Sequence, residues 1–287
     1  MAQRPLWLLA AAWIGAAGAA PTPAGQPAML AATYQASAER LRNSPFRRPL
    51  TLQSAESGAA LRGEVYALVD QPLAMVSAAL SSTAGWCEVL LMHPNVAGCR
   101  VTGSVAAPKL AVDLGTRLDA SPDAPYHVEF AFRRVQADDS YLQLRLDADE
   151  GPVGTRDYRI LLEAVPVEGK SFLHFSYSYA YGLSARLATQ AYLSTKGRNK
   201  VGFTPVGEDY IGGLRGAVER TAMRYYLAIE AYLAELATPE DRRFERSLQR
   251  WLDGIAEYPR QLKEEGTREE YAQIKRGQYR RQQLALH

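Results

Sequence analysis

The side chains that could perform chemistry are few, and they form no catalytic motif. The sequence holds four histidines, His93, His127, His174 and His287, and no His-Glu-x-x-His or Gly-x-Ser-x-Gly pattern. His127 and His174 fall on the polar phase of alternating segments, so we expect both to be exposed to solvent. His93 precedes a proline, and we expect it to make hydrogen bonds within a loop. The sequence therefore predicts no catalytic residue, no metal ligand and no cofactor.

A stripe of aromatic side chains is the strongest candidate for binding. Aromatic residues occupy every second position over 175–181, which places them on one face of a β-strand. Tyrosine rings give apolar walls, and their hydroxyls orient a ligand that has few polar atoms. An ordinary packed core is the alternative for the same rings. The candidate ligand-binding residues are Phe130, Phe132, Phe175, Tyr177, Tyr179, Tyr181 and Tyr225.

The N-terminus has the pattern of a secretory signal peptide. Arg4 precedes an apolar run that ends at Ala20, and small residues over 17–19 suit a cleavage site. A membrane anchor is the alternative, but the run is short and rich in alanine and glycine. We expect removal of residues 1–20, no transmembrane segment in the remaining chain, and a periplasmic or secreted location.

Outside the cytoplasm, the two cysteines favour a disulfide. Cys87 and Cys99 lack the Cys-x-x-Cys spacing, and no histidine pair completes a tetrahedral metal site with them. Closing so short a loop stabilises a fold by about 3 kcal/mol in the chain-entropy treatment.

Composition sets the remaining limits. Hydrophobic residues make up 47% of the 287 residues and charged residues 22%, which is enough for a large core. The formal net charge of +2 argues against a nucleic-acid partner, because binding phosphates requires a surplus of cations.

Periodicity predicts the elements that must position these residues. Residues 28–43 have helical spacing, and a hairpin is expected over 49–69. Two short helices follow, and strict alternation then predicts an antiparallel meander over 100–204, including a strand over 187–193. A long amphipathic helix over 211–236 is placed to cover the apolar face of this sheet.

The last segment, 238–287, is rich in charges of both signs and is expected to be helical. Its basic end contains Lys275, Arg276, Arg280 and Arg281. We interpret these residues as a solvated helix face or as a contact for an acidic partner or anionic lipid.

This order of elements, with the run Gly63-Glu64-Val65-Tyr66-Ala67-Leu68-Val69-Asp70-Gln71-Pro72 before the short helices, resembles the START-like (SRPBCC, helix-grip) superfamily. The resemblance covers about 49–237. It implies an α+β fold in which a curved antiparallel sheet grips a long C-terminal helix, often around an apolar cavity. Members bind lipids, sterols or polyketides, and some are cyclases or hydrolases. An incomplete barrel with a helical lid, like periplasmic lipoprotein carriers, is the alternative architecture.

We therefore divide the chain into a signal peptide (1–20), a leader with a short helix (21–48), the START-like domain (49–237) and a charged helical extension (238–287). The expected function is that of an exported soluble binding protein for a lipid-like or other apolar ligand between sheet and helix. One alternative is a module that docks another envelope protein through the extension. The other is a cyclase or hydrolase with Arg186 and Glu219 at the cavity mouth.

Overall fold

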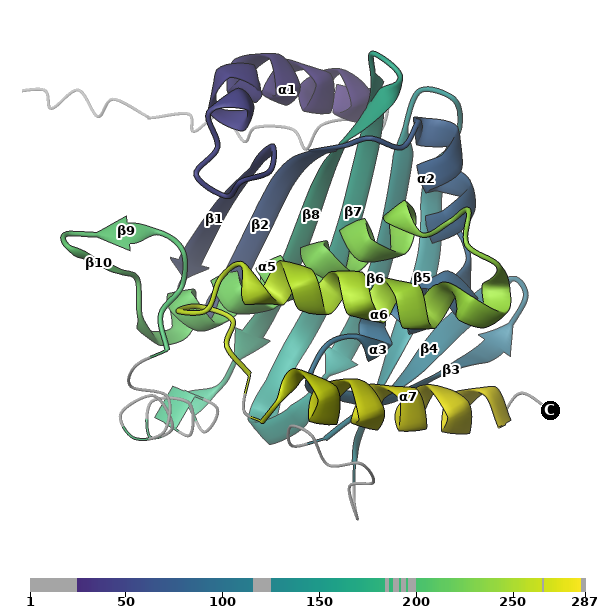
Figure 1. The fold of residues 1–287 in the computed structure, drawn as a ribbon. Helices are drawn as coiled ribbons and strands as arrows, with labels where there is room; N and C mark the ends of the chain where they lie inside the picture. The colour runs from purple at the N-terminus through teal and green to yellow at the C-terminus, as the bar shows by residue number, and fades with distance from the viewer. Residues whose placement is uncertain are drawn as a thin grey trace, which may run out of the picture.

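Eight antiparallel strands form one sheet in the order β1-β2-β8-β7-β6-β5-β4-β3 (Figure 1). The computed structural model describes residues 25–115, 125–183, 186, 187, 191, 195, 200–264 and 266–284. The predicted signal peptide lies outside these ranges. The strands are β1 (Leu50–Ser57), β2 (Ala60–Val69), β3 (Val96–Ser104), β4 (Ala107–Leu114), β5 (Tyr126–Ala137), β6 (Leu142–Glu150), β7 (Thr155–Val167) and β8 (Lys170–Tyr181).

Six α-helices that lie wholly within the described part of the chain accompany this sheet. They are α1 (Gln26–Arg42), α2 (Leu73–Leu80), α3 (Thr83–Leu91), α5 (Gly213–Ala234), α6 (Glu240–Ala256) and α7 (Arg268–Leu284). A small hairpin of β9 (Pro205–Val206) and β10 (Asp209–Tyr210) precedes α5. The predicted hairpin, short helices, meander and long helix are confirmed. The predicted strand over 187–193 is wrong, because Leu187 and Ala191, the residues described there, are helical.

Alternation of apolar and polar residues explains why the strands form a sheet with two different faces. Leu142, Leu144 and Leu146 of β6 are fully buried on the face that α5 covers. Helix α5 lies across this concave face (Figure 1). At Gly63 of β2 an added Cβ would stand 2.8 Å from the carbonyl oxygen of Val218, so glycine is needed for helix and sheet to approach this closely. This arrangement confirms the α+β, helix-grip fold.

Helix α1 covers part of the opposite, outer face. Its Leu30 and Leu41 are buried against side chains that alternate outward from the sheet, among them Phe172 and Val165. The ring of Tyr34 lies 5.2 Å from that of Phe172. The leader predicted over 21–48 therefore contains a helix that packs on the sheet.

Helices α6 and α7 pack on the same core as α5, as Figure 1 shows from the front. Trp251 of α6 is fully buried and donates its indole N–H to the carbonyl of Arg224 at 3.1 Å. Tyr271 of α7 stacks on Trp251 at 5.3 Å. Lys275 is only 1% exposed, so neither a solvated face nor a partner contact describes it, and that prediction is wrong for this residue. The domain boundaries themselves stay a prediction.

The disulfide prediction is confirmed. Cys87 of α3 and Cys99 of β3 are joined across a sequence separation of 12. Within the described ranges, no cluster of three or more His, Cys, Asp or Glu side chains is suited to hold a metal ion. No single described helix has the length and apolarity to cross a membrane, although α2 and α3 meet the criterion as a pair bent by 85°.

Candidate functional site: a tyrosine cluster between the sheet and α5

Four tyrosines from three elements meet on the concave face, and we name Tyr158, Tyr177, Tyr179 and Tyr225 the tyrosine cluster. Antiparallel pairing of β7 with β8 brings Tyr158 beside the other two strand residues, with ring centroids 6.2 Å from Tyr177 and 5.3 Å from Tyr179. Tyr225 of α5 closes the group from the helix side, 5.7 Å from Tyr177. The strand members are half-buried, and Tyr225 is buried.

The hydroxyls of the cluster make few hydrogen bonds to the described residues. Tyr158 donates to Thr155 Oγ1 at 2.7 Å. Tyr177, Tyr179 and Tyr225 make no side-chain hydrogen bond in the described part of the chain. Burial, and next the neighbouring Tyr158, raise the pKa of Tyr177 and Tyr179, so both stay protonated donors at neutral pH. Their oxygens are accessible to solvent rather than buried without a partner, so water or a ligand can bond them.

Five of the seven predicted residues lie in or against this cluster. Phe130 contacts Tyr158 edge-on at 6.4 Å, and Phe175 lies 6.2 Å from Tyr225. Tyr181 instead donates its hydroxyl to Glu56 at 2.5 Å, at the end of the strand. Phe132 lines a separate groove. Tyr158 was missed, although its alternation with Ile160 and Leu162 signals the same face.

His93 adjoins the cluster, which its position in sequence did not indicate. Its ring stacks on Tyr225 at 4.5 Å and is 5% exposed. The expected loop hydrogen bond is present, because Nδ1 accepts from the backbone N–H of Asn95 at 3.2 Å. Burial, with the nearby charges of Arg224 and Lys275, lowers the pKa of His93. The neutral ring therefore carries its proton on Nε2, which is buried and has no partner among the described residues.

Lys275 fixes the turn that carries His93. Its ammonium donates to the carbonyl oxygens of His93 at 2.8 Å and Val96 at 2.7 Å. Burial lowers the pKa of Lys275 to about 7, while Glu264 opposes the shift. Tyr271 adds a hydrogen bond from its hydroxyl to the carbonyl of Met92 at 2.7 Å. Helix α7 therefore holds this turn through buried contacts.

Three hollows of the described residues lie away from the cluster. Grooves of about 750 and 740 Å³ open on either side of α3, and one of about 690 Å³ lies between α6 and the hairpin β1–β2. Of the seven predicted ligand-binding residues, only Phe132 lines one of these three. The cluster rings contact each other, so a ligand must enter between them or displace one.

The outer face holds a polar network that the sequence did not predict. His174 is 9% exposed rather than solvated, so the expectation for it is wrong. Its Nδ1 lies 2.7 Å from Glu163 and its Nε2 lies 3.1 Å from Glu64. Tyr141 donates to Glu163, and Gln143 bridges Glu163 and Gln26 of α1 at 3.1 and 2.7 Å. The other strand histidine, His127, is exposed as expected and lies 2.7 Å from Asp113.

Electrostatics make the His174 network an ion triad. Burial works against charge on the imidazole, but hydrogen bonds with Glu163 and Glu64 outweigh it and raise the pKa of His174. Burial likewise opposes charge on the two carboxyls, and hydrogen bonding to His174 lowers the pKa of both. A cation between two carboxylates is thus the favoured state.

The polar residues proposed for a cavity mouth lie elsewhere. Glu219 is fully buried and accepts hydrogen bonds from Ser54 Oγ at 2.6 Å and from the backbone N–H groups of Phe203 and Thr204 at 2.6 and 2.9 Å. It ties the loop before α5 to β1. Arg186 is exposed. The cyclase or hydrolase alternative therefore loses Glu219 as its acid or base.

Comparisons with solved structures find distant similarities. The Zhui aromatase/cyclase from Streptomyces sp. R1128 is 9% identical over 62% of this chain and 96% of its own, with a TM-score of 0.39. A STAR-related lipid transfer protein from Xanthomonas axonopodis is 16% identical over 51% and 85%, with a TM-score of 0.34. Human StAR-related lipid transfer protein 5 is 13% identical over 58% and 90%, with a TM-score of 0.31.

No protein-family model matches the sequence, and no curated protein matches it. At such low identities and TM-scores, nothing that these proteins bind or catalyse is carried over to this chain. The observed strand order and the helix across the concave face carry the assignment instead. By its own topology, the chain has the helix-grip fold of START-like proteins.

Proposed function

We propose that this protein binds an apolar, lipid-like molecule at the tyrosine cluster, and that it does so without catalysis. The single observation that carries the proposal is the group of three unbonded hydroxyls, those of Tyr177, Tyr179 and Tyr225, within an aromatic surface. A ligand that is mostly hydrocarbon, with one or two hydrogen-bond acceptors, satisfies both the rings and the hydroxyls.

The same proposal includes export. The signal-like N-terminus and the disulfide between Cys87 and Cys99 both support a compartment outside the cytoplasm. A carrier of apolar molecules is useful in such a compartment, because apolar molecules are poorly soluble in the water that they must cross.

Native mass spectrometry of the purified protein, followed by organic extraction, tests for a carried molecule directly. A titration with the fluorescent fatty acid cis-parinaric acid gives an affinity. We expect saturable binding, because the probe combines a hydrocarbon chain with a carboxylate acceptor. No bound molecule together with no saturable binding would overturn the proposal.

Variants locate the site. Tyr177→Phe and Tyr225→Phe each remove a hydroxyl and keep the ring, so the fold should survive while affinity falls by roughly three- to tenfold, the worth of one hydrogen bond. Tyr141→Phe is the matched control on the outer face. An equal loss of affinity in all three variants would place the probe elsewhere and contradict the assignment of the site.

A further inference from the structure

Strand β3 forms one edge of the sheet, and only part of that edge is covered. No strand of the described chain pairs with the side of β3 that faces away from β4. Helix α7 covers the first part of this side. Lys275 donates to the carbonyl oxygen of Val96 at 2.7 Å, and Gln282 Oε1 accepts from the backbone N–H of Cys99 at 3.1 Å. Beyond Cys99, no described residue bonds this side of the strand.

The strand register identifies the peptide groups that point away from the sheet. In an antiparallel pair, residues that exchange hydrogen bonds with the partner strand alternate with residues whose N–H and C=O point outward. Cys99 points outward, because its N–H bonds Gln282 of α7. Val101 and Gly103 therefore point outward as well. The partner of Gly103 is Pro108, which has no N–H to give, and this agrees with the assignment.

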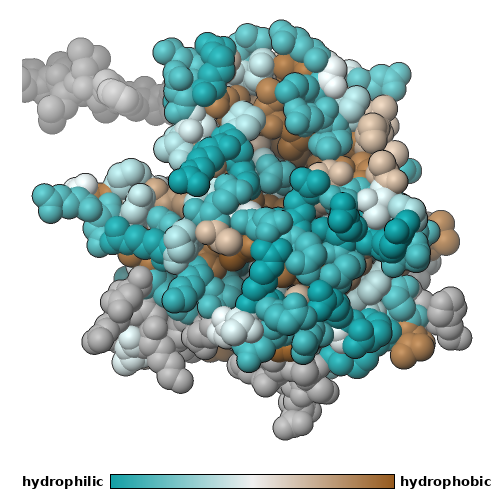
Figure 2. Space-filling model, in the orientation of Figure 1, coloured by the Kyte–Doolittle hydropathy of each residue, from teal (hydrophilic) through white to brown (hydrophobic). Residues whose placement is uncertain are grey.

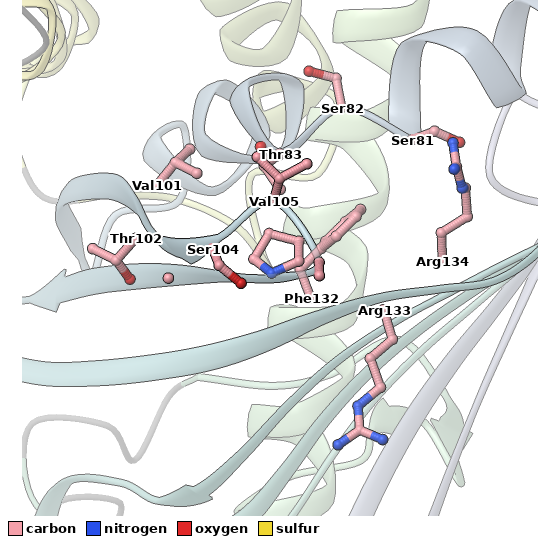
Figure 3. A pocket seen from close by; sticks show the side chains of 13 residues that line it. Ser81, Ser82, Thr83, Val101, Thr102, Ser104, Val105, Phe132, Arg133 and Arg134 are labelled. Carbon is pink, nitrogen blue, oxygen red and sulfur yellow. The ribbon is translucent and has the colours of Figure 1, made fainter.

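These outward peptide groups are accessible, and they lie between two grooves. Val101 is 40% exposed, and Gly103 is exposed. Figure 3 shows the groove on the hairpin side, which Val101 and Val105 line together with residues 82 and 83 at the start of α3. Val101 also lines the groove of about 740 Å³ between α3, α6 and α7. We name residues 101–103 the free edge of β3, along which an extended chain has room to lie.

The groove between α3, α6 and α7 is acidic, and we name it the acidic groove. Its charged lining residues are Glu88, Glu240 and Asp241, and its described lining includes no lysine or arginine. None of these carboxylates is in an ion pair with a described residue, and Glu240 and Asp241 are exposed. Arg243, which attracts Glu88, donates to the carbonyl oxygen of Thr238 at 3.4 Å and does not line the groove. A cationic side chain is therefore favoured in this groove.

The direction of the side chains connects the free edge with the acidic groove. In a chain that pairs with β3, a residue opposite Val101 points to the same face of the sheet as Val101 does. That face is the concave one, because Val101 is paired with the buried Leu110 of β4. The next residue of the added chain points to the other face, beside Arg100 and Thr102. Alternation of basic with neutral polar residues thus fits the edge.

We propose that the free edge of β3 binds an extended basic segment of another protein, in which lysine or arginine occupies alternate positions. The backbone of this segment bonds the peptide groups of Val101 and Gly103, as an added strand does. Its basic side chains enter the acidic groove beside Glu240 and Asp241. The backbone bonds supply affinity, and the alternate side chains supply specificity.

A second copy of this chain fits the edge less well. Pairing of β3 with β3 of another copy would place the uncharged residues Cys99, Val101 and Gly103 on the face of the acidic groove. The carboxylates would then lose water without gaining a cation. No residue of the tyrosine cluster lines either groove at the free edge. The proposal is therefore independent of the apolar ligand proposed above.

Fluorescence anisotropy of the full chain with a labelled, capped peptide of alternating threonine and lysine tests the proposal. We expect saturable binding that weakens as salt is raised. The same peptide with glutamate in place of lysine should not bind measurably. Methylation of the backbone nitrogens of the lysines, which face β3, should weaken binding roughly tenfold through lost hydrogen bonds. Methylation of the threonine nitrogens, which face away, is the matched control.

Variants of the protein locate the peptide. Glu240→Gln combined with Asp241→Asn should weaken the lysine peptide roughly three- to tenfold, because two exposed charge pairs are lost. Glu39→Gln combined with Glu168→Gln removes the same charge at exposed positions outside the groove and should change the affinity less than about twofold. Val101→Pro removes an edge N–H that makes no bond within the protein, and it should weaken binding several-fold. Val101→Thr keeps this N–H and should bind normally.

Several outcomes would overturn the proposal. Equal losses in the two double variants would show a general charge effect, and equal affinity of the two methylated peptides would exclude pairing with the edge. The methylated peptides test the same bond even where Val101→Pro fails to fold. A dimer of the free protein that Val101→Pro dissociates in sedimentation would assign the edge to a second copy. Absence of saturable binding would also refute the proposal, whereas binding of cis-parinaric acid reports separately on the tyrosine cluster.

Discussion

The two faces of the sheet use tyrosine in opposite ways. On the outer face, Tyr141 donates to Glu163 inside a network that also satisfies His174 and Gln143. On the concave face, Tyr177 and Tyr225 leave their hydroxyls unbonded. Only the first arrangement adds hydrogen bonds within the protein, since the hydroxyls of the concave face remain accessible to solvent. The second arrangement leaves donors on the concave face that no described residue uses.

The hydropathy of the surface agrees with the packing of α6 and α7 over the core. Figure 2 shows mainly hydrophilic residues across the face formed by α6 and α7, with hydrophobic residues visible near α1 and α2. The charged extension thus shields the core, and its use as a dock for another protein stays a prediction.

The largest effect is expected from breaking the ion triad on the outer face. His174→Gln leaves Glu64 and Glu163 facing each other without a cation, and we expect a loss of about 3 kcal/mol in the free energy of unfolding at pH 6. Urea denaturation measures it. His127→Gln is the control, since its ring is 67% exposed and its change should be near zero. Equal losses of unfolding free energy in the two variants would mean that the triad stabilises the protein no more than an exposed histidine does.

The triad also predicts a dependence on pH. The raised pKa of His174 means that its contribution is complete below its ordinary pKa of 6.5 and is lost as pH rises through the higher folded value. The pKa values of Glu64 and Glu163 are lowered, so the stability that these carboxylates contribute is fully present above their ordinary pKa of 4.5. It is lost as pH falls through the lower folded values. The gap in stability between wild type and His174→Gln should therefore be widest between about pH 4.5 and 6.5. A gap that widens above pH 8 would contradict a charged imidazole.

On the α3 side, Glu88 provides the reverse case. Burial raises its pKa to about 7, against the pull of Arg243, and its Oε2 is unbonded. The native state holds a proton that the unfolded chain releases above 4.5, so stability falls as pH rises from 4.5 to 7. Glu88→Gln should stabilise the protein by roughly 1–3 kcal/mol at pH 8 and by little at pH 4. Glu39→Gln, at an exposed position, is the control and should leave the stability unchanged at both pH values. A loss of stability at pH 8 in Glu88→Gln would refute the burial argument.

The smallest effects come from paired removals of a hydroxyl. Tyr141→Phe should cost about 1–2 kcal/mol in the free energy of unfolding, because Glu163 loses a donor. Tyr177→Phe should change it by less than about 0.5 kcal/mol, since no bond is lost. Thermal unfolding of both variants in one buffer measures the difference. Similar costs for the two would remove the contrast between the faces.

Local periodicity predicted most of the fold, and long-range contacts explain the errors. Alternation placed Phe130, Phe175 and Tyr177 on one face correctly. It also placed His174 outward correctly, but it contains no sign that Glu64 and Glu163 bond that side chain or that Tyr66 stacks on it. In the sequence, Lys275 is indistinguishable from the other charged residues of a polar helix.

Lys275 is held in the interior by hydrogen bonds to the carbonyl oxygens of His93 and Val96, which are about 180 residues away in sequence. The strand expected over 187–193 failed because a short apolar segment does not distinguish a strand from a helix, and the described Leu187 and Ala191 are helical.

The pairing of β2 with β8 has a consequence for how the chain folds. Glu64 and His174, which meet across these strands, are 110 residues apart. The hairpin β1–β2 must wait for β8 before its inner edge is covered, so closure of the sheet depends on joining distant parts of the chain. High contact order of this kind predicts slow folding, limited by loop-closure entropy rather than by the local disulfide.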